Sequence, residues 1–328
     1  MKGRRPGPIY TLYSHEAIVE RDCWHYNTAM HLQSIYLSLD ILTGMVISVM
    51  VVANTLFGQE TTMGVSLIVN HTIGLFILSM ILLFGKKSSL IYPTQQKAPW
   101  YLYFNGLFGL AILNLNYVTV IYAGASLAMA STVFGQSFSS LVFDLIGFMG
   151  MKKRKLNTKK ALSLCVSGIG IAIMASKNSG EFAVLYVLLG VLAGALTMTQ
   201  MVLNSTLASY WGSIRASWQN FLGGLAAGLL FYFLIQTDQT IAGILRIPSL
   251  SPILVTAGGI LAVFVVVSTS FVVIKIPAIY SALLLSAAQI LMSLFIDTIF
   301  FDTFSLHLLL GALLMLAGMA GNLAADKK

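Results

Sequence analysis

Long apolar runs, separated by short polar or Gly/Pro-containing breaks, cover most of this chain. A membrane-spanning helix needs about 20 mostly apolar residues, with a range of roughly 17–25. Ten runs meet this requirement, which predicts spans at approximately 35–57, 64–84, 100–122, 126–148, 158–176, 182–207, 214–235, 252–273, 278–301 and 306–324. The pattern indicates an all-α integral membrane protein with ten transmembrane helices.

The composition supports a lipid-solvated fold. Hydrophobic residues make up 57% of the 328 residues and charged residues only 9%, against roughly a quarter charged in a typical soluble domain. The net charge of +8 comes from basic residues in short loops between apolar segments. Such loops are typical of membrane orientation signals rather than of a nucleic-acid-binding face. The lipid bilayer is therefore a predicted partner, and nucleic acid is not.

The basic residues also predict an orientation. With ten spans both termini lie on one side of the membrane, and that side holds 17 of the 19 lysines and arginines, including the basic run at 152–160. The other side holds two, Lys177 and Arg246. Because basic loops stay inside, we expect both termini to be cytoplasmic, in the cell membrane. Residues 1–34 lack the features of a signal peptide. They are predicted to be a cytoplasmic leader, disordered or lying on the membrane surface.

An internal repeat divides the rest of the chain into units at 35–176 and 177–328. Overlaying residue n on residue n+150, or on n+153 in the third and fourth spans, aligns polar residues and glycines rather than leucines and valines. The aligned pairs include Gly44 with Gly194, Asn54 with Asn204, Asn70 with Asn220, Gln136 with Gln289, Ser140 with Ser293, and Asp144 with Asp297. Chance overlay of two apolar segments does not produce such a series, so the chain arose by duplication.

Each unit has five spans, and because five is odd, the second unit must enter the membrane from the opposite side. Inverted repeats related by a two-fold axis in the membrane plane are a recurrent construction of secondary transporters. Two nearly equivalent halves can rock about a shared site and expose it to each side in turn. The architecture therefore predicts a transporter or exporter of small organic solutes that works by alternating access.

Three segments carry a resemblance to a known family. They are GQSFSSLVFDLIGFMG (135–150), AAQILMSLFIDTIFFDTF (287–304) and QMVLNSTLASYWGSIRASWQNFLGG (200–224). They resemble the YdcZ-like branch of the bacterial drug/metabolite transporter (DMT) superfamily, in a fused, two-unit form, over roughly residues 36–324. The resemblance implies a ten-helix DMT-type fold with a central cavity between the halves. The sequence departs from the family pattern at Met50, which stands opposite Gln200, and at Ala288, which stands opposite Gly135.

Polar side chains within the spans mark a candidate pathway, because such residues usually face protein or a water-filled cavity. Gln136 and Gln289 fall near mid-span, and the serines and aspartates that follow at i+4 and i+8 lie on the same helix face. They either line a cavity or join helices by hydrogen bonds. The same two interpretations apply to the span asparagines. The predicted pathway residues are Gln136, Gln289, Ser140, Ser293, Asn114, Gln200, Asn204 and Asn54.

Asymmetry between the units adds a second criterion. Asn114 lies mid-membrane in a polar strip that only the first unit has, so it is a candidate for substrate asymmetry. Asn54 and Asn70, like their counterparts in the second unit, are most simply interpreted as inter-helix hydrogen-bond partners. His71 is expected near the membrane interface, in contact with solvent.

Three acidic residues, Asp40, Asp144 and Asp297, are candidates for proton or ion coupling. A carboxyl group buried in a medium of low dielectric constant takes up a proton more readily than one in water. The alternative interpretation is structural. Asp144 and Asp297 would cap the following segment or pair with a nearby cation, and Asp40 would be solvated at the interface.

Metal, cofactor and enzyme chemistry find no support in the motifs. Cys23 and Cys165 have no metal-binding or redox spacing, and the spacing of His15, His25 and His31 matches no ligand motif. The sequence contains neither a phosphate-binding GxxxxGK[ST] loop nor a catalytic motif of an intramembrane enzyme. We therefore expect no cofactor, no metal and no catalysis.

An alternative to transport is a membrane accessory or scaffold subunit that keeps the fold and loses the polar cavity. The departures at Met50 and Ala288 favour this alternative. A homodimer is left open by the sequence.

Overall fold

The computed structural model describes residues 15–85, 97–150, 153, 158–176, 183–272 and 278–326, and this part of the chain is all helical. The first half contains α1 (His15–Glu60), α2 (Met63–Phe84), η1 (Trp100–Phe104), α3 (Leu107–Ile146), η2 (Phe148–Gly150) and α4 (Thr158–Ala175). The second half contains α5 (Ala183–Trp211), α6 (Ser213–Ile235), α7 (Thr237–Arg246), η3 (Ile247–Ser249), α8 (Pro252–Val272), α9 (Ala278–Ile299) and α10 (Leu306–Asp326).

The helices account for the ten predicted spans. Among the described residues, seven segments are long and apolar enough to cross a membrane, and one of them, Trp100–Ile146, is 47 residues long and contains both the third and the fourth predicted spans. Within it the backbone of Gly124 leaves the helical region at φ 80°, ψ 163°, between the predicted spans 100–122 and 126–148. Two shorter apolar helical segments, Leu283–Ile299 and Leu306–Asn322, correspond to the last two spans.

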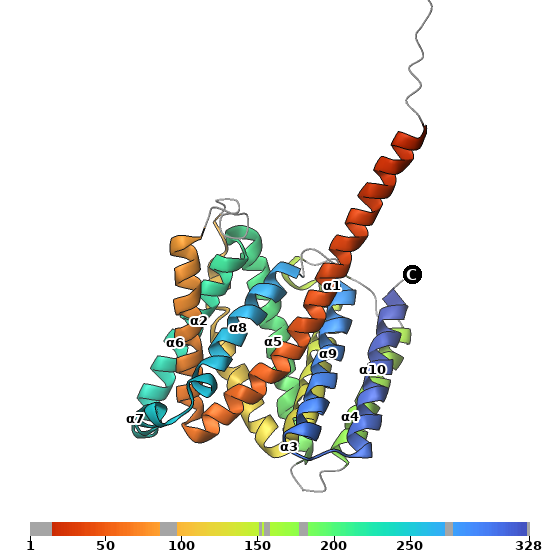
Figure 1. Ribbon diagram of the computed structural model, residues 1–328. Coiled ribbons are helices and arrows are strands. Elements are labelled where there is room, and N and C mark those ends of the chain that lie inside the picture. Colours follow the sequence, from red (N-terminus) through yellow and green to blue (C-terminus); the bar gives the residue numbers. More distant parts are fainter. Residues whose placement is uncertain are drawn as a thin grey trace, which may run out of the picture.

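The described part of the predicted leader is helical, which the sequence did not predict. α1 begins at His15, 20 residues before the predicted first span at residue 35, and runs on without interruption to Glu60. Figure 1 shows the first part of α1 extending well beyond the bundle. A reason lies in the sequence, because residues 15–34 contain neither glycine nor proline, the two residues that most often end a helix. The backbone from residue 15 therefore forms a helix rather than a disordered tail.

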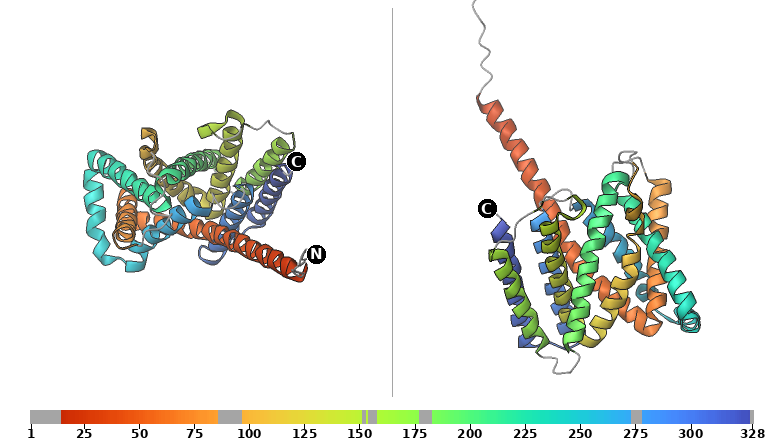
Figure 2. Two further views of the ribbon diagram at one scale, coloured as in Figure 1. Left: turned by 90° about the horizontal axis from the view of Figure 1, so that it is seen from above. Right: turned by 180° about the vertical axis from the view of Figure 1, so that it is seen from behind.

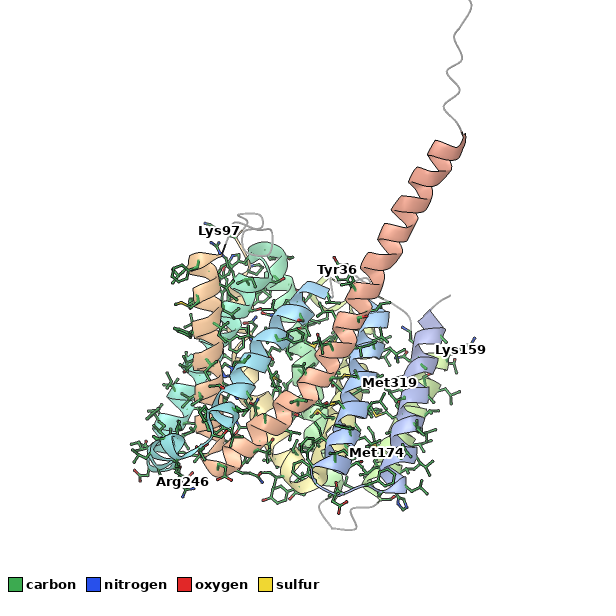
Figure 3. All side chains as sticks on the ribbon, viewed as in Figure 1. Tyr36, Lys97, Lys159, Met174, Arg246 and Met319 are labelled. Carbon is green, nitrogen blue, oxygen red and sulfur yellow. The ribbon has the colours of Figure 1, made fainter. Side chains whose placement is uncertain are left out.

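The helices of the two halves interlock. α2 packs against α6 and α4 against α10, while α1 lies along α8 and α9 and α5 lies along α3. Figures 1 and 2 show the α4–α10 pair at one side of the bundle and α6 with α7 at the other. Lys97 lies at the upper edge in Figure 3 and Arg246 at the lower edge.

Small residues allow this close packing, and large apolar residues cover the outside. A Cβ atom on Gly44 would collide with the backbone of Leu285, and one on Gly194 would collide with that of Thr132. Such close helix approach is typical of membrane bundles. Large side chains such as Phe76 and Leu230 are 63% and 66% exposed on the outer surface. In a bilayer this surface faces lipid.

Candidate functional site

A central cavity of about 180 Å³ lies between the two halves. Its wall is built by α1, α2 and α3 from the first half and by α5, α6 and α8 from the second. An ordered water needs about 10–15 Å³ by the same measure, so the cavity has room for a small organic solute. The polar part of the wall consists of amide and hydroxyl side chains, chiefly those of Asn54, Asn70, Asn116, Gln136, Gln200, Asn204 and Asn220.

In the second half, a hydrogen-bonded group of amides joins α5 and α6 to the start of the third span. Gln200 Nε2 donates to Asn220 Oδ1 at 2.9 Å and to the Asn105 carbonyl at 3.2 Å. Asn105 Nδ2 donates to Asn204 Oδ1 at 2.9 Å. Asn204 Nδ2 in turn donates to Ser270 Oγ on α8 at 2.7 Å. Gln200 and Asn204, both predicted pathway residues, therefore line the cavity and also join helices.

The equivalent group in the first half is smaller. Asn70 Nδ2 on α2 donates to Asn54 Oδ1 on α1 at 2.7 Å. Both residues are buried and both line the cavity. The positions that correspond to Gln200 and Asn105 are Met50 and Gly258. The inter-helix hydrogen bonding expected for Asn54 and Asn70 is present as a bond between their two side chains.

The two central glutamines lie in different environments. Gln136 lines the cavity. Gln289 is fully buried, and neither its Oε1 nor its Nε2 atom has a hydrogen-bond partner among the described residues. Gln289 is absent from the described cavity wall, as are the two serines predicted beside the glutamines. Ser293 is buried and donates to the Ile290 carbonyl at 2.8 Å, while Ser140 is half-buried. The two aligned stripes therefore lie in different surroundings in this structure.

Asn114, a predicted pathway residue, contacts a tyrosine of the other half. Its Nδ2 atom lies 2.7 Å from the hydroxyl oxygen of Tyr232 on α6, and that hydroxyl lies 2.9 Å from Asn114 Oδ1. Nδ2 also donates to the Leu110 carbonyl at 2.6 Å. Asn114 therefore joins α3 to α6, and it is not among the described wall residues.

Asp297 caps a helical segment of the other half. Its Oδ1 accepts a hydrogen bond from the Ala125 backbone N–H at 3.1 Å, and its Oδ2 accepts one from the Ser126 N–H at 2.7 Å. These two N–H groups follow the break at Gly124, where a helical segment starts and its first N–H groups lack intrahelical partners. The capping predicted for Asp297 is therefore present, although the capped segment belongs to the first half rather than following α9.

A second cavity of about 400 Å³ adjoins Asp297. Its wall includes Gly124, Gln59 near the end of α1, and Thr303 between α9 and α10. Thr55 lines both this cavity and the central one. Arg246 Nη1 donates to the carbonyl of Glu60, next to Gln59, at 3.5 Å. The second cavity therefore lies on the side of the bundle where Arg246 is found.

The other two candidate acids lie elsewhere. Asp144 Oδ2 is 3.7 Å from Lys160 Nζ on α4, with 25% of its side chain exposed. This ion pair matches the structural interpretation, pairing with a nearby cation. Asp40 is 1% exposed, so the expectation of a solvated interfacial residue is wrong. The described residues contain no cluster of three or more His, Cys, Asp or Glu that could hold a metal. The side chains of His15, His25 and His31 lie outside the described part.

Sequence reasoning missed several cavity residues, among them His71 and Tyr117. His71 Nδ1 lies 2.9 Å from the Leu67 carbonyl, and its ring lies 5.5 Å from that of Phe221. His71 therefore lies in the wall of the central cavity, and the expectation of a solvated histidine near the membrane interface is wrong. Its neighbour Asn70, one of the aligned polar residues, was the available signal.

Comparison with known proteins identifies the family. The family model described as "Putative inner membrane exporter, YdcZ" matches residues 35–173 and, again, residues 185–321. No curated protein matches the chain. A crystal structure of another protein superposes with a TM-score of 0.58 at 16% sequence identity, covering 88% of this chain and 94% of that one. At this identity the likeness concerns the fold alone. The double match shows that the chain belongs to the YdcZ family of membrane transport proteins, in a form that carries the family's unit twice.

Proposed function

We propose that this protein is a secondary transporter that moves small organic solutes across the cell membrane by alternating access. The observation that carries the proposal is the central cavity, whose polar wall is contributed by both halves of the chain. Ligand sites are typically concave, mostly apolar and lined by a few polar groups that fix orientation. An accessory subunit has no need of such a wall, so the retained amides favour a transporter.

Equivalent contacts support an inverted arrangement of the two repeats. A Cβ on Gly74 would meet the Phe221 ring, and a Cβ on Gly224 would meet the His71 ring. In the internal alignment Gly74 corresponds to Gly224 and His71 to Phe221, so the two contacts exchange under the repeat operation. The interlocked helices follow the same rule, because α1 against α8 and α9 mirrors α5 against α3. A two-fold axis in the membrane plane accounts for this exchange.

The orientation with both termini in the cytoplasm follows from the basic residues. Lys97 and Arg246 lie at opposite edges of the bundle. Single cysteines at these two positions, in a Cys23→Ser, Cys165→Ser background, are treated in intact cells with a membrane-impermeant maleimide. We expect labelling at position 246 and none at position 97. Labelling in the reverse pattern would require the opposite orientation.

Proton coupling is assigned to Asp297, because it lines a cavity while Asp144 is ion-paired. Loss of its charge would release the two N–H groups at the Gly124 break and so link protonation to movement between the halves. Asp297→Asn is expected to flatten the pH dependence of transport, whereas Asp144→Asn is expected to keep it. An unchanged pH profile in Asp297→Asn, Asp144→Asn and Asp40→Asn would rule out coupling through these acids.

Ligand-dependent thermal stabilisation tests the proposal as a whole. The purified protein is unfolded in detergent in the presence of each member of a metabolite panel. At least one compound is expected to raise the melting temperature, and Gln136→Ala is expected to abolish that shift. Gln289→Ala is the matched control, since Gln289 lies outside the described cavity wall. If no compound stabilises the protein and both substitutions are tolerated, the accessory-subunit alternative takes the place of the transporter.

A further inference from the structure

One of the differences between the amide groups of the two halves concerns an acceptor atom. In the second half, Asn220 Oδ1 accepts a hydrogen bond from Gln200 Nε2 at 2.9 Å. The equivalent atom of the first half, Asn70 Oδ1, has no hydrogen-bond partner among the described residues. The cause is visible in the internal alignment, because Met50 stands where the second half has Gln200. A thioether cannot donate a hydrogen bond.

The unpaired acceptor is costly where it lies. Asn70 is 2% exposed, and leaving a buried acceptor without a partner is destabilising. Its Nδ2 atom is already used in the 2.7 Å bond to Asn54 Oδ1, so the group left over is the carbonyl oxygen. Both asparagines and Met50 line the central cavity. Asn70 Oδ1 is itself covered, so a molecule in the cavity would satisfy Asn70 if its N–H group reaches this covered oxygen.

The rest of the wall limits what this molecule can be. Among the described wall residues none is a lysine, arginine, aspartate or glutamate, and the titratable groups are His71 and Tyr117. Burying an isolated charge without a counter-charge is far more costly than burying a hydrogen-bonded neutral group. Apolar side chains, among them those of Met50, Met129 and Phe221, supply the remaining surface. The wall therefore suits an uncharged solute with an apolar body.

We infer that Asn54 and Asn70 form a subsite that recognises uncharged solutes through an amide-like N–H donor, which takes the position that Gln200 fills in the other half. This inference rests on the proposed function of the central cavity as the substrate site. It goes beyond that function because it names the chemical class of the solute, neutral carboxamides and related N–H donors. It also names the atom that accepts the hydrogen bond, Asn70 Oδ1. The expected hydrogen bond from the solute to Asn70 Oδ1 corresponds to the bond from Gln200 Nε2 to Asn220 Oδ1 in the second half.

The test introduces by mutation the amide that the first half lacks. Met50→Gln places an amide where the second half has Gln200 and is expected to occupy Asn70 Oδ1 from within the protein. Without ligand, this variant should melt at a higher temperature than the natural protein. Its affinity for benzamide, measured by thermal-shift titration of the full-length protein in detergent, should fall by about tenfold or more, the loss expected for one hydrogen bond of about 1.4 kcal/mol. Met50→Leu is the matched control, because it changes the same wall residue without adding an amide; benzamide should bind Met50→Leu at least tenfold more tightly than Met50→Gln.

The probes separate the donor from the rest of the ligand. N,N-Dimethylbenzamide keeps the ring and the carbonyl but has no N–H, while benzoate and benzylammonium keep the ring and carry a charge. Benzamide is expected to bind the natural protein at least tenfold more tightly than each of the other three. Asn70→Leu, which removes the acceptor, should also weaken benzamide binding and serves as a second variant should Met50→Gln fail to fold.

Two outcomes would overturn the inference: equal binding of benzamide and N,N-dimethylbenzamide, or full benzamide affinity in Met50→Gln. If benzamide binding is nevertheless lost in Gln136→Ala, the central cavity remains the ligand site and only the donor subsite is wrong. If instead the natural protein binds none of the four probes and no member of the metabolite panel, both the subsite and the proposed function are wrong.

Discussion

Asp297 illustrates how one side chain can join the two halves of this protein. Its carboxylate accepts hydrogen bonds from the backbone N–H groups of Ala125 and Ser126, at 3.1 and 2.7 Å. A negative charge at the start of a helical segment is favoured by the helix dipole, and both carboxylate oxygens are used. The contact joins α9 of the second half to α3 of the first.

Replacing Asp297 by asparagine should destabilise the protein. An amide offers one acceptor oxygen, so one of the two N–H groups would face an NH₂ group instead of an oxygen. We expect a loss of about 1–2 kcal/mol, as for other helix N-cap substitutions. In a chain of this size such a loss corresponds to a drop of a few degrees in melting temperature, which thermal unfolding in detergent can measure.

Asp302→Asn provides the matched control for this prediction. Asp302 is exposed and has a φ angle of 50°, a left-handed conformation that asparagine tolerates as well as aspartate. The change in charge is the same, so the melting temperature should stay within about a degree of the natural value. Equal losses in the two variants would mean that charge, and not capping, is responsible.

The sequence could predict these polar residues but not their partners. Gln136 and Gln289 occupy equivalent positions, and both are polar and near mid-span. Only Gln136 faces the cavity, because the surroundings of each residue depend on the helices that pack around it. His71 was misplaced for the same reason: hydropathy gives its depth only roughly and gives no information on the helix face that a cavity will occupy.

At the scale of the helices, the break at Gly124 is the feature that positions Asp297. Its backbone lies at φ 80°, ψ 163°, a region that is essentially restricted to glycine. Helical residues lie on both sides, so the break exposes N–H groups at the start of a half-helix in the interior of the bundle. Asp297 accepts hydrogen bonds from these N–H groups.

Gly124→Ala should therefore lower stability by about 1–3 kcal/mol, the usual cost of forcing a side chain into such a conformation. Gly168→Ala within α4 is the comparison. A Cβ at Gly168 would lie 3.7 Å from the nearest atom of Phe134, and alanine favours a helix over glycine by up to about 1 kcal/mol. Thermal unfolding should show a lower melting temperature for Gly124→Ala and an equal or higher one for Gly168→Ala. A melting temperature for Gly124→Ala at or above the natural value would argue against strain at this break.

The helix boundaries show which features the hydropathy pattern can predict and which it cannot. The predicted spans end at residue 122 and resume at 126, so the sequence locates the break around Gly124 correctly. It does not reveal that the carboxylate capping the break comes from a residue more than 170 positions further along. The upstream part of α1 was also not predicted, because counting apolar residues detects membrane spans and is insensitive to a polar helix that continues beyond one.

At the scale of the whole molecule, the two halves are interlocked rather than apposed. The first helix of each half lies against helices of the other half, α1 along α8 and α9, and α5 along α3. Each interface depends on a glycine at the same place in the repeat. A Cβ on Gly44 would collide with the Leu285 carbonyl, and one on Gly194 would collide with the Thr132 carbonyl. In the internal alignment, Gly44 corresponds to Gly194 and Thr132 to Leu285.

This equivalence leads to a quantitative prediction. Overpacking a close helix contact typically costs about 1–3 kcal/mol, so Gly44→Ala and Gly194→Ala should each lower the melting temperature, and by similar amounts. Gly223→Ala is the control, because a Cβ there would lie 3.4 Å from its nearest neighbour, Gly106 Cα. If the two halves are related by a two-fold axis, the contacts cannot differ much in tightness. A large loss in one variant and tolerance of the other would mean that only one of the interfaces is tightly packed.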